Sequence, residues 1–212
     1  NLNEVWVDDN FTSNNTGDYM WGYNAFSKIQ DAIDAVTDGG IIHVAAGTYT
    51  ENLTINKSLS IKSLSGADST IVIDNSNGSS AIFDISADNV TIDGFTLKNA
   101  SSGYGAIYIH NYTSHANYIL VENCIFSNNG GDIWVDKGAD YTTINKNTFN
   151  GSNSDDQAWG IWLSSVDNNK ITNNTISNKG YSFYGAIYLE FSDYNTISDN
   201  DFDLKLKELE AL

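Results

Sequence analysis

Residues 132–202 repeat one short pattern almost three times. Each unit reads as an apolar–aromatic–apolar strand, a polar turn and a second strand of the form Ile-x-x-Asn-x-Phe/Ile. The isoleucines that open the units, Ile133, Ile161 and Ile187, are spaced by 28 and 26 residues. A period in this range is typical of stacked repeats, in which one unit cannot bury its apolar face alone. The sequence therefore predicts a solenoid.

The alternation within each unit indicates strands rather than helices. At 133–135, 161–163 and 187–189 the aliphatic residues point to one side and the aromatic residue to the other. Proline is absent and glycines cluster at unit edges, as expected for short strands joined by tight turns. We predict an all-β fold, a right-handed parallel β-helix with one coil per unit and about 4.8 Å between rungs.

Stacking of the coils predicts rows of equivalent residues along the axis. The inward rows are Ile107, Ile133, Ile161, Ile187; Val121, Ile144, Ile171, Ile197; and Leu97, Phe126, Phe149, Ile176, Phe202. Asn147, Asn174 and Asn200 also align, so that each amide can bond the amide of the next rung. Cys124 takes the same position one unit earlier and is expected to be a buried small hydrophobe.

The N-terminal part differs from the repeats. Residues 26–36 carry the apolar spacing of an amphipathic helix, with Ser27 as the predicted N-cap, and such a helix would cover the first rung. We divide the chain into an N-terminal strand and capping helix at 1–40, the β-helix at 41–203, and residues 204–212. The last segment is leucine-rich and charged, which suits a C-terminal cap, a linker or an appended tail.

Composition excludes some partners and favours export. The formal net charge is −17 and all ten basic residues are lysine, so nucleic acid and anionic membranes are not expected partners. No apolar run reaches membrane-spanning length and no signal-peptide pattern is present, as in a mature or excised fragment. The acidity, the few lysines and the Asn-x-Ser/Thr sites favour an extracellular or cell-surface glycoprotein. These sites are Asn10, Asn14, Asn52, Asn56, Asn77, Asn89, Asn99, Asn111, Asn150 and Asn173.

Two parts of the chain resemble a known superfamily. The run FSKIQDAIDAVTDGGIIHVAAGTYTENLTINKSLSIKS at 26–63 resembles the N-terminal segment of pectin-lyase-like right-handed parallel β-helix proteins. The later units resemble the parallel β-helix repeats of that superfamily, including NosD-like surface proteins. The resemblance covers roughly residues 26–203 and implies the fold. It leaves function open, because this architecture carries lyases, esterases, hydrolases, tailspikes and adhesins.

The catalytic motifs of the enzymatic branches do not carry over to this chain. Pectinesterase-like members need an arginine beside paired aspartates, and pectate-lyase-like members usually use an arginine as the base. This sequence has no arginine. Polygalacturonase-like members carry Asn-Thr-Asp and Gly-His-Gly motifs, which are also missing, and the only Asp-Asp pairs are Asp8-Asp9 and Asp155-Asp156. The chain is therefore expected to lean away from catalysis.

An outward aromatic row is the strongest functional pattern in the sequence. Tyr108, Trp134, Trp162 and Tyr188 would stack in successive rungs, and Phe83 would extend the row if its ring points outward. Such a stripe suits the apolar faces of sugar rings. The structural alternative is that the rings stack on one another under the loops at 102–105 and 181–184. We hypothesise carbohydrate binding at this row.

Catalytic and metal-binding candidates are weaker. The next outward row contains His110, Asp136, Ser164 and Glu190. Asp136 and Glu190 stand two rungs apart and could form a hydrolytic carboxyl pair only if their side chains lean together. The favoured interpretation is that these are two solvated acidic side chains without a catalytic role. No cofactor and no His/Cys metal site is expected. The turns at 8–10 and 155–157 offer oxygen ligands for calcium, although no loop fits an EF-hand.

The sequence leaves three functions open. The favoured one is a non-catalytic surface or adhesin-like module that contacts glycans or neighbouring subunits through the aromatic row. The second is a polysaccharide-acting enzyme that uses Asp136 and Glu190. The third is a structural spacer or filament subunit that makes homotypic contacts at its ends.

Overall fold

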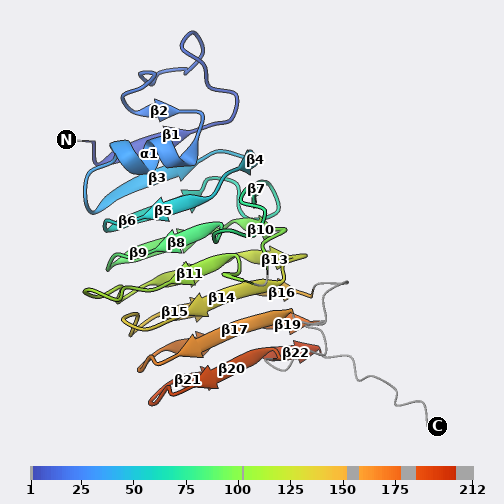
Figure 1. Ribbon diagram of the computed structural model, residues 1–212. Coiled ribbons are helices and arrows are strands. Elements are labelled where there is room, and N and C mark those ends of the chain that lie inside the picture. The colour runs from blue at the N-terminus through green and yellow to red at the C-terminus, as the bar shows by residue number, and fades with distance from the viewer. Residues whose placement is uncertain (1, 102, 152–157, 178–184, 204–212) are drawn as a thin grey trace.

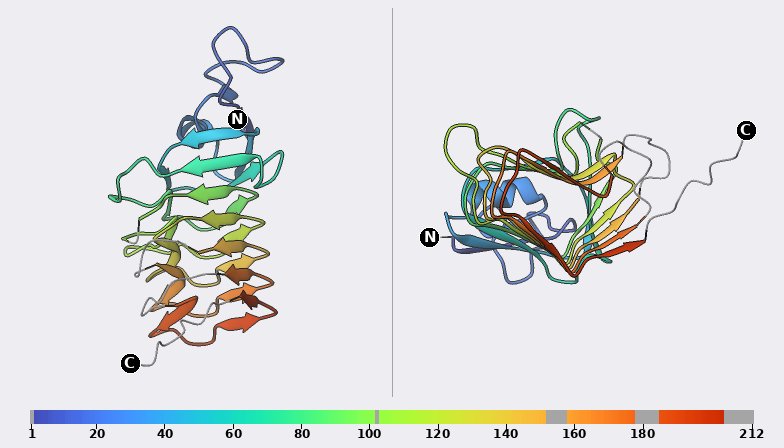
Figure 2. Two further views of the ribbon diagram at one scale, coloured as in Figure 1. Left: turned by 90° about the vertical axis from the view of Figure 1, so that its right-hand side faces the viewer. Right: turned by 90° about the horizontal axis from the view of Figure 1, so that it is seen from below.

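A computed structural model describes residues 2–101, 103–151, 158–177 and 185–203. The described strands form three parallel sheets that wind around one axis, and successive coils stack from the N-terminal to the C-terminal end (Figure 1). The view along the axis in Figure 2 shows the coils superimposed around a common interior. The predicted right-handed parallel β-helix is confirmed.

From β3 onward each full coil contributes one strand to each sheet, and β1 and β2 extend the nine-stranded sheet at its N-terminal end. The nine-stranded sheet has the order β2 (Ala25–Phe26), β1 (Glu4–Val7), β3 (Gly40–Val44), β6 (Leu59–Ser63), β9 (Val90–Asp93), β12 (Leu120–Glu122), β15 (Thr143–Asn145), β18 (Lys170–Thr172), β21 (Thr196–Ser198). The seven-stranded sheet contains β4 (Gly47–Thr50), β7 (Thr70–Ile73), β10 (Thr96–Lys98), β13 (Ile125–Ser127), β16 (Thr148–Asn150), β19 (Thr175–Ser177), β22 (Asp201–Asp203). The six-stranded sheet contains β5 (Leu53–Ile55), β8 (Phe83–Ile85), β11 (Ile107–Ile109), β14 (Gly131–Val135), β17 (Trp159–Ser164), β20 (Ile187–Glu190).

The register places equivalent residues above one another, as the spacing predicts. The three inward rows are paired along the axis. Phe126 and Phe149 stack inside with their ring centroids 4.6 Å apart. Burial of each such side chain is worth about 2–3 kcal/mol, so the interior rows are the main source of stability. In the final described rung Leu189, Ile197 and Phe202 are exposed.

Buried asparagines link the rungs through their amides. The Asn147 backbone N–H donates to the Asn174 Oδ1 at 2.9 Å, and the Asn174 N–H donates to the Asn200 Oδ1 at 2.9 Å. The predicted ladder is confirmed, and Cys124 donates its backbone N–H to the Asn147 Oδ1 at its start. Burial raises the pKa of the Cys124 thiol to about 12, so the sulfur stays a neutral packing group.

A second ladder was not predicted from the sequence. The Thr142 N–H donates to the Asn169 Oδ1 at 2.7 Å, and the Asn169 N–H donates to the Asn195 Oδ1 at 2.8 Å. Both ladders lie at turns, where the backbone leaves one sheet for the next, and they satisfy N–H groups that would otherwise be buried without a partner.

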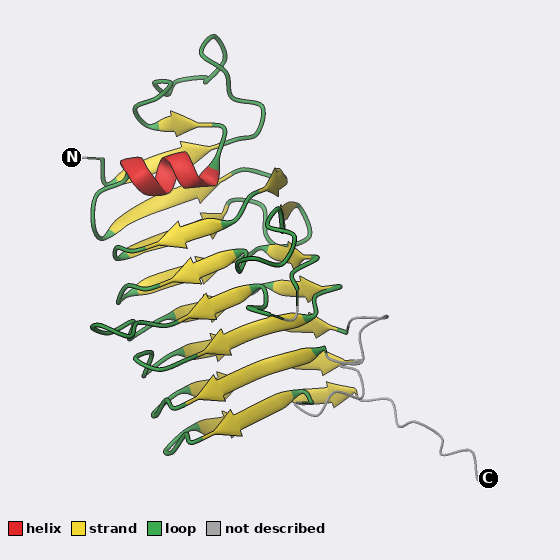
Figure 3. Cartoon of the chain, in the orientation of Figure 1, coloured by secondary structure: helices red, strands yellow, loops and turns green. Residues whose placement is uncertain are grey.

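Helix α1 (Ile29–Ala35) covers the first coil, as Figure 3 shows in red. Its buried residues Ile29, Ala32 and Ile33 face the interior. The predicted start of the helix is wrong. Phe26 belongs to β2, and Lys28 rather than Ser27 is the N-cap, without a side-chain hydrogen bond.

A carboxylate from the next coil takes the place of the missing cap. Glu51 accepts the N–H groups of Ile29 at 2.9 Å and Gln30 at 3.1 Å. These are two of the donors that every helix leaves unpaired at its first turn, and a negative charge is favourable there. The helix is therefore fixed to the solenoid by a side chain that lies 22 residues away from Ile29 in sequence.

Candidate functional site

The six-stranded sheet carries the predicted aromatic residues in one column. The register pairs Tyr108 with Trp134, Trp134 with Trp162, and Trp162 with Tyr188. We call these four residues the aromatic column. Phe83 is not part of it, because Phe83 pairs with Ile107 and is fully buried. Asp84 pairs with Tyr108 and takes the outward position in that rung.

The rings of the column pack against one another. Trp134 and Trp162 are nearly parallel, with centroids 4.7 Å apart and planes at 6°. Tyr108 lies 4.8 Å from Trp134, and Tyr188 meets Trp162 edge-on at 5.9 Å. Because the parallel faces are used within the column, Trp134 and Trp162 present ring edges rather than the flat stripe envisaged from the sequence.

Tyr108 is the most enclosed ring of the column, with only 6% of its surface exposed. The His110 imidazole stacks on it at 4.2 Å, and Tyr104 contacts it at 5.6 Å. His110 Nε2 lies 3.0 Å from Asp84 Oδ1, so the imidazole is held between a phenol face and a carboxylate. This arrangement fixes the position of His110 at the end of the column.

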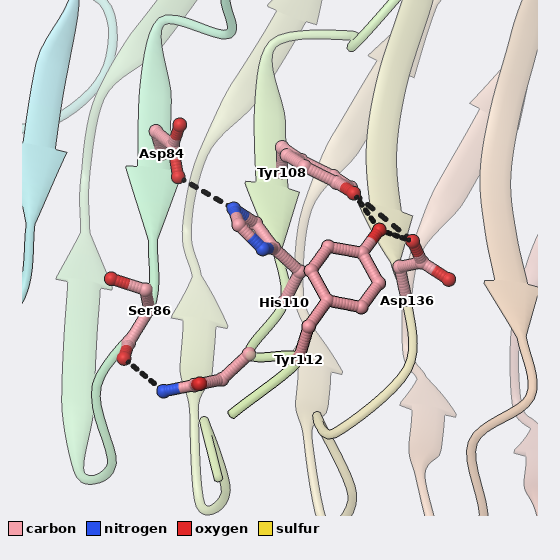
Figure 4. A network of polar contacts seen from close by, with 7 residues as sticks. Asp84, Ser86, Tyr108, His110, Tyr112 and Asp136 are labelled. Carbon is pink, nitrogen blue, oxygen red and sulfur yellow. Dashed lines mark hydrogen bonds and ion pairs between the residues drawn. The ribbon is translucent and has the colours of Figure 1, made fainter. Parts of the chain in front are cut away.

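Tyr108, Tyr112 and Asp136 form the polar network that Figure 4 shows. Both phenol groups donate to Asp136 Oδ2, Tyr108 at 3.0 Å, and the two phenol oxygens lie 2.6 Å apart. Burial, the hydrogen bond with Tyr112 and the charge of Asp136 raise the pKa of Tyr108 well above its usual value. Burial and the hydrogen bond to Asp136 raise the pKa of Tyr112 as well. Both phenols therefore stay protonated and keep donating.

A hollow of about 530 Å³ opens at this end of the column. Its lining residues are Ser79, Ser80, Asp84, Tyr104, Tyr108, His110, Tyr112 and Trp134. Tyr104 and Tyr112 are 40% and 61% exposed, so these two rings offer accessible surface. Hydroxyl, carboxylate and imidazole groups lie among the rings. A mostly aromatic concavity with a few polar groups is typical of small-ligand sites.

The predicted carboxyl pair lies partly in this region. Asp136 is 8% exposed and its Oδ2 accepts two phenols from the preceding coil. Glu190 is half-buried and lies two rungs from Asp136, where it pairs with Ser164 of the intervening rung. The backbones at these rungs are about 10 Å apart, and the Asp136 Oδ2 is engaged by the phenols of Tyr108 and Tyr112. The hydrolytic pair stays a prediction.

Within the described ranges, no three His, Cys, Asp or Glu side chains converge as a metal site would require. At 8–10 the carboxylates of Asp8 and Asp9 accept hydrogen bonds from Asn10, and Asp9 also binds the Thr48 N–H. The other calcium candidate, 155–157, lies outside the described residues. In the described part of the chain, no helix has the length and hydrophobicity for a membrane crossing.

Sequence reasoning missed five of the lining residues, which are Ser79, Ser80, Asp84, Tyr104 and Tyr112. Asp84 would follow from placing Phe83 inward, which shifts the alternation by one residue. Tyr112 continues the outward alternation of Tyr108 and His110 beyond the end of β11. Tyr104 sits in a loop, and no periodic signal marks a loop residue.

The sequence model described as "Right handed beta helix region" matches residues 40–204. The chain belongs to the right-handed β-helix family. The resemblance seen in the repeats is thereby confirmed. Membership fixes the architecture and leaves the function to be argued from the site.

One curated relative is the cell surface glycoprotein of Methanothermus fervidus, 31% identical over an alignment of 233 positions. The alignment covers 82% of this chain but only 38% of the relative, so the chain spans well under half of that protein.

Solved structures similar to the chain include two pectin methylesterases. The pectin methylesterase from Aspergillus niger, in a form deglycosylated to an N-acetylglucosamine stub, is 16% identical to this chain. The match covers 98% of this chain and 87% of the esterase chain, with a TM-score of 0.42. A pectin methylesterase variant in complex with a hexasaccharide is 15% identical, covering 98% and 68%, with a TM-score of 0.49. Similarity this distant says nothing about activity.

Proposed function

We propose that this chain is a non-catalytic β-helix module of a cell-surface protein, and that it binds carbohydrate in the hollow at the end of the aromatic column. The observation that carries the proposal is the lining of the hollow. Exposed tyrosine rings stand beside a carboxylate, an imidazole and two serine hydroxyls within about 530 Å³. A volume of this size suits one or two sugar units.

The chemistry of the lining matches the two sides of a sugar ring. Tyr104 and Tyr112 can contact the apolar C–H face, because aromatic rings favour such contacts. Asp84 and His110 can accept and donate hydrogen bonds to hydroxyls, and their mutual contact holds them in place before a ligand arrives. Tyr108 and Trp134 form the wall of the hollow, while the edges of Trp162 and Tyr188 would guide a longer glycan along the sheet.

The surface location rests on the relative and the composition. The relative is a cell surface glycoprotein, and this chain is rich in glycosylation sequons and carries a formal net charge of −17, which disfavours nucleic acid as a partner. An acidic surface with a formal charge of −17 also disfavours polyanionic glycans, so neutral saccharides are the expected ligands.

A glycan array followed by titration tests the proposal. We expect wild-type protein to bind neutral glycans, and the double variant Tyr104→Ala/Tyr112→Ala to bind at least tenfold more weakly. Tyr23→Ala is the matched control, since Tyr23 is 50% exposed and lies outside the hollow. Equal binding by wild type and the double variant would refute the hollow as the site.

The enzymatic alternative has its own assay. If Asp136 and Glu190 act on polysaccharide, wild-type protein would release reducing sugar and Asp136→Asn would not. Because Asp136 already binds two phenols, we expect no release from either protein.

End-to-end contact is favoured by one observation. The apolar Leu189, Ile197 and Phe202 are exposed in the final described rung, and exposed apolar strand residues offer a surface for a further copy. Sedimentation at increasing concentration tests this alternative, and Phe202→Ser would abolish any such association.

A further inference from the structure

A row of residues with left-handed backbone runs along one turn of the solenoid. The register aligns Thr91, Leu120, Thr143, Lys170 and Thr196. Two residues before each of them stands one member of the turn row, which consists of Asn89, Tyr118, Tyr141, Asn168 and Tyr194. Their φ angles are 56°, 60°, 59°, 59° and 55°. The five residues therefore adopt one conformation in five successive coils.

Tyrosine is an unusual choice for this conformation. A Cβ atom disfavours the left-handed region, and asparagine tolerates it best among the residues with side chains. The same chain uses asparagine at two of the five positions. The turn itself is held by its neighbours, because the Asp140 Oδ1 accepts the Asp167 N–H and the Asp167 Oδ1 accepts the Asp193 N–H, both at 2.7 Å.

The three tyrosine rings are not needed for the interior. Tyr118, Tyr141 and Tyr194 are 58%, 46% and 84% exposed. Strained positions that carry exposed rings point to recognition rather than packing.

The row lacks one ring in its middle. Tyr118 and Tyr141 stack with centroids 5.1 Å apart and planes at 15°. Rings in adjacent coils of this row are therefore close enough to contact each other face to face. Tyr141 and Tyr194 are two rungs apart, about 10 Å, which leaves room for one further ring between them. The residue in that gap is Asn168, which is exposed and, within the described residues, makes no side-chain hydrogen bond.

We propose that this gap is a second saccharide site, a slot that takes one pyranose ring between Tyr141 and Tyr194. The two phenol rings contact the two apolar faces of the sugar, and the Asn168 amide donates to one hydroxyl and accepts from another. Lys170, exposed on the next strand, adds a donor at the rim. If an aromatic side chain of another protein filled the gap, the Asn168 amide would have no hydrogen-bonding partner on it. A sugar ring offers hydroxyl groups to that amide, and it is therefore the favoured occupant.

The slot is independent of the hollow. Its residues precede β15, β18 and β21 in the nine-stranded sheet, whereas the hollow is formed at β8, β11 and β14 in the six-stranded sheet. Failure of either site leaves the other standing.

Saturation-transfer NMR with methyl glycosides of glucose, galactose and N-acetylglucosamine tests the slot. The protein is the double variant Tyr104→Ala/Tyr112→Ala, so that the hollow does not contribute. We expect saturation of the sugar ring protons, and at least tenfold weaker binding in two further variants made in this background. Tyr194→Asn removes one face and restores the residue preferred by the backbone, and Asn168→Tyr fills the gap with the missing ring.

Asn89→Tyr in the same background is the matched control, since it adds an exposed tyrosine to the turn row three rungs away from the gap. It should bind as the parent does. No saturation of any of the three glycosides, or equal binding after Asn168→Tyr or after Tyr194→Asn, would overturn the proposal.

Discussion

Replacing Asn174 with alanine removes the middle residue of the buried amide ladder. Asn174 is 1% exposed and its side chain makes four hydrogen bonds. Its Oδ1 accepts the Asn147 N–H at 2.9 Å and the Asn147 Nδ2 at 3.1 Å, and its Nδ2 donates to the Ile144 carbonyl and the Asn200 Oδ1, both at 2.9 Å.

The cost of this change follows from the groups left behind. The Asn147 N–H loses its acceptor, and an orphaned buried donor costs about 1–3 kcal/mol. The three other lost hydrogen bonds contribute about 1 kcal/mol each. We therefore expect the free energy of unfolding to fall by about 4–6 kcal/mol.

Urea denaturation followed by circular dichroism measures this loss. Asn150→Ala is the control, because Asn150 is exposed in the neighbouring coil and should change stability by less than about 0.5 kcal/mol. If Asn174→Ala lost less than about 1 kcal/mol, the ladder would not be a stabilising element and the reasoning would be wrong.

Three further predictions test other parts of the structure. Glu51→Gln removes the charge at the start of α1 and should cost about 0.5–2 kcal/mol, visible as a lower thermal midpoint; an unchanged midpoint would contradict the capping role. Gly160→Ala places a Cβ against the Ala186 carbonyl oxygen of the next rung and should cost at least about 2 kcal/mol, whereas Gly103→Ala meets only ordinary contacts and should be neutral. The raised pKa of Tyr108 means that the folded state keeps a proton that the unfolded chain loses above pH 10. Stability should be full below that pH and fall above it, and Tyr108→Phe should flatten the decline; a pH profile identical to that of wild type would contradict this linkage.

The repeat pattern predicts the fold because each rung obeys the same alternation. Ile133, Ile161 and Ile187 must all face inward, and a slip by one residue would expose them. This constraint also places Asn147, Asn174 and Asn200 in one row. Phe83 shows its limit, since a strand with aromatic and aliphatic residues at adjacent positions fits either register until its neighbours are known.

Contacts between distant segments could not be predicted. Ser27 has the right chemistry for an N-cap, but the Glu51 carboxylate reaches the helix from the next coil and carries a full charge. The orientation of the aromatic rings also cannot be predicted from the alternation of residues along the strands. Alternation fixes the side of the sheet on which Trp134 lies, but not the side-chain rotation that turns its face toward Trp162.

The hollow depends both on contacts between distant segments and on the orientation of its aromatic rings. Tyr104 and Tyr112 come from segments that flank β11, and Asp84 comes from the preceding rung. None of the three lies in the part of the sequence where the repeat is regular. The turn row, in contrast, is readable once the register is known, since its five members follow the spacing of the strands.

A crystal structure of the chain with the saccharide that binds most tightly on the array tests the central claim directly. The proposal predicts a sugar ring in the hollow, in contact with Tyr104 or Tyr112 and hydrogen-bonded to Asp84 or His110. A saccharide bound elsewhere with the hollow left empty would contradict it.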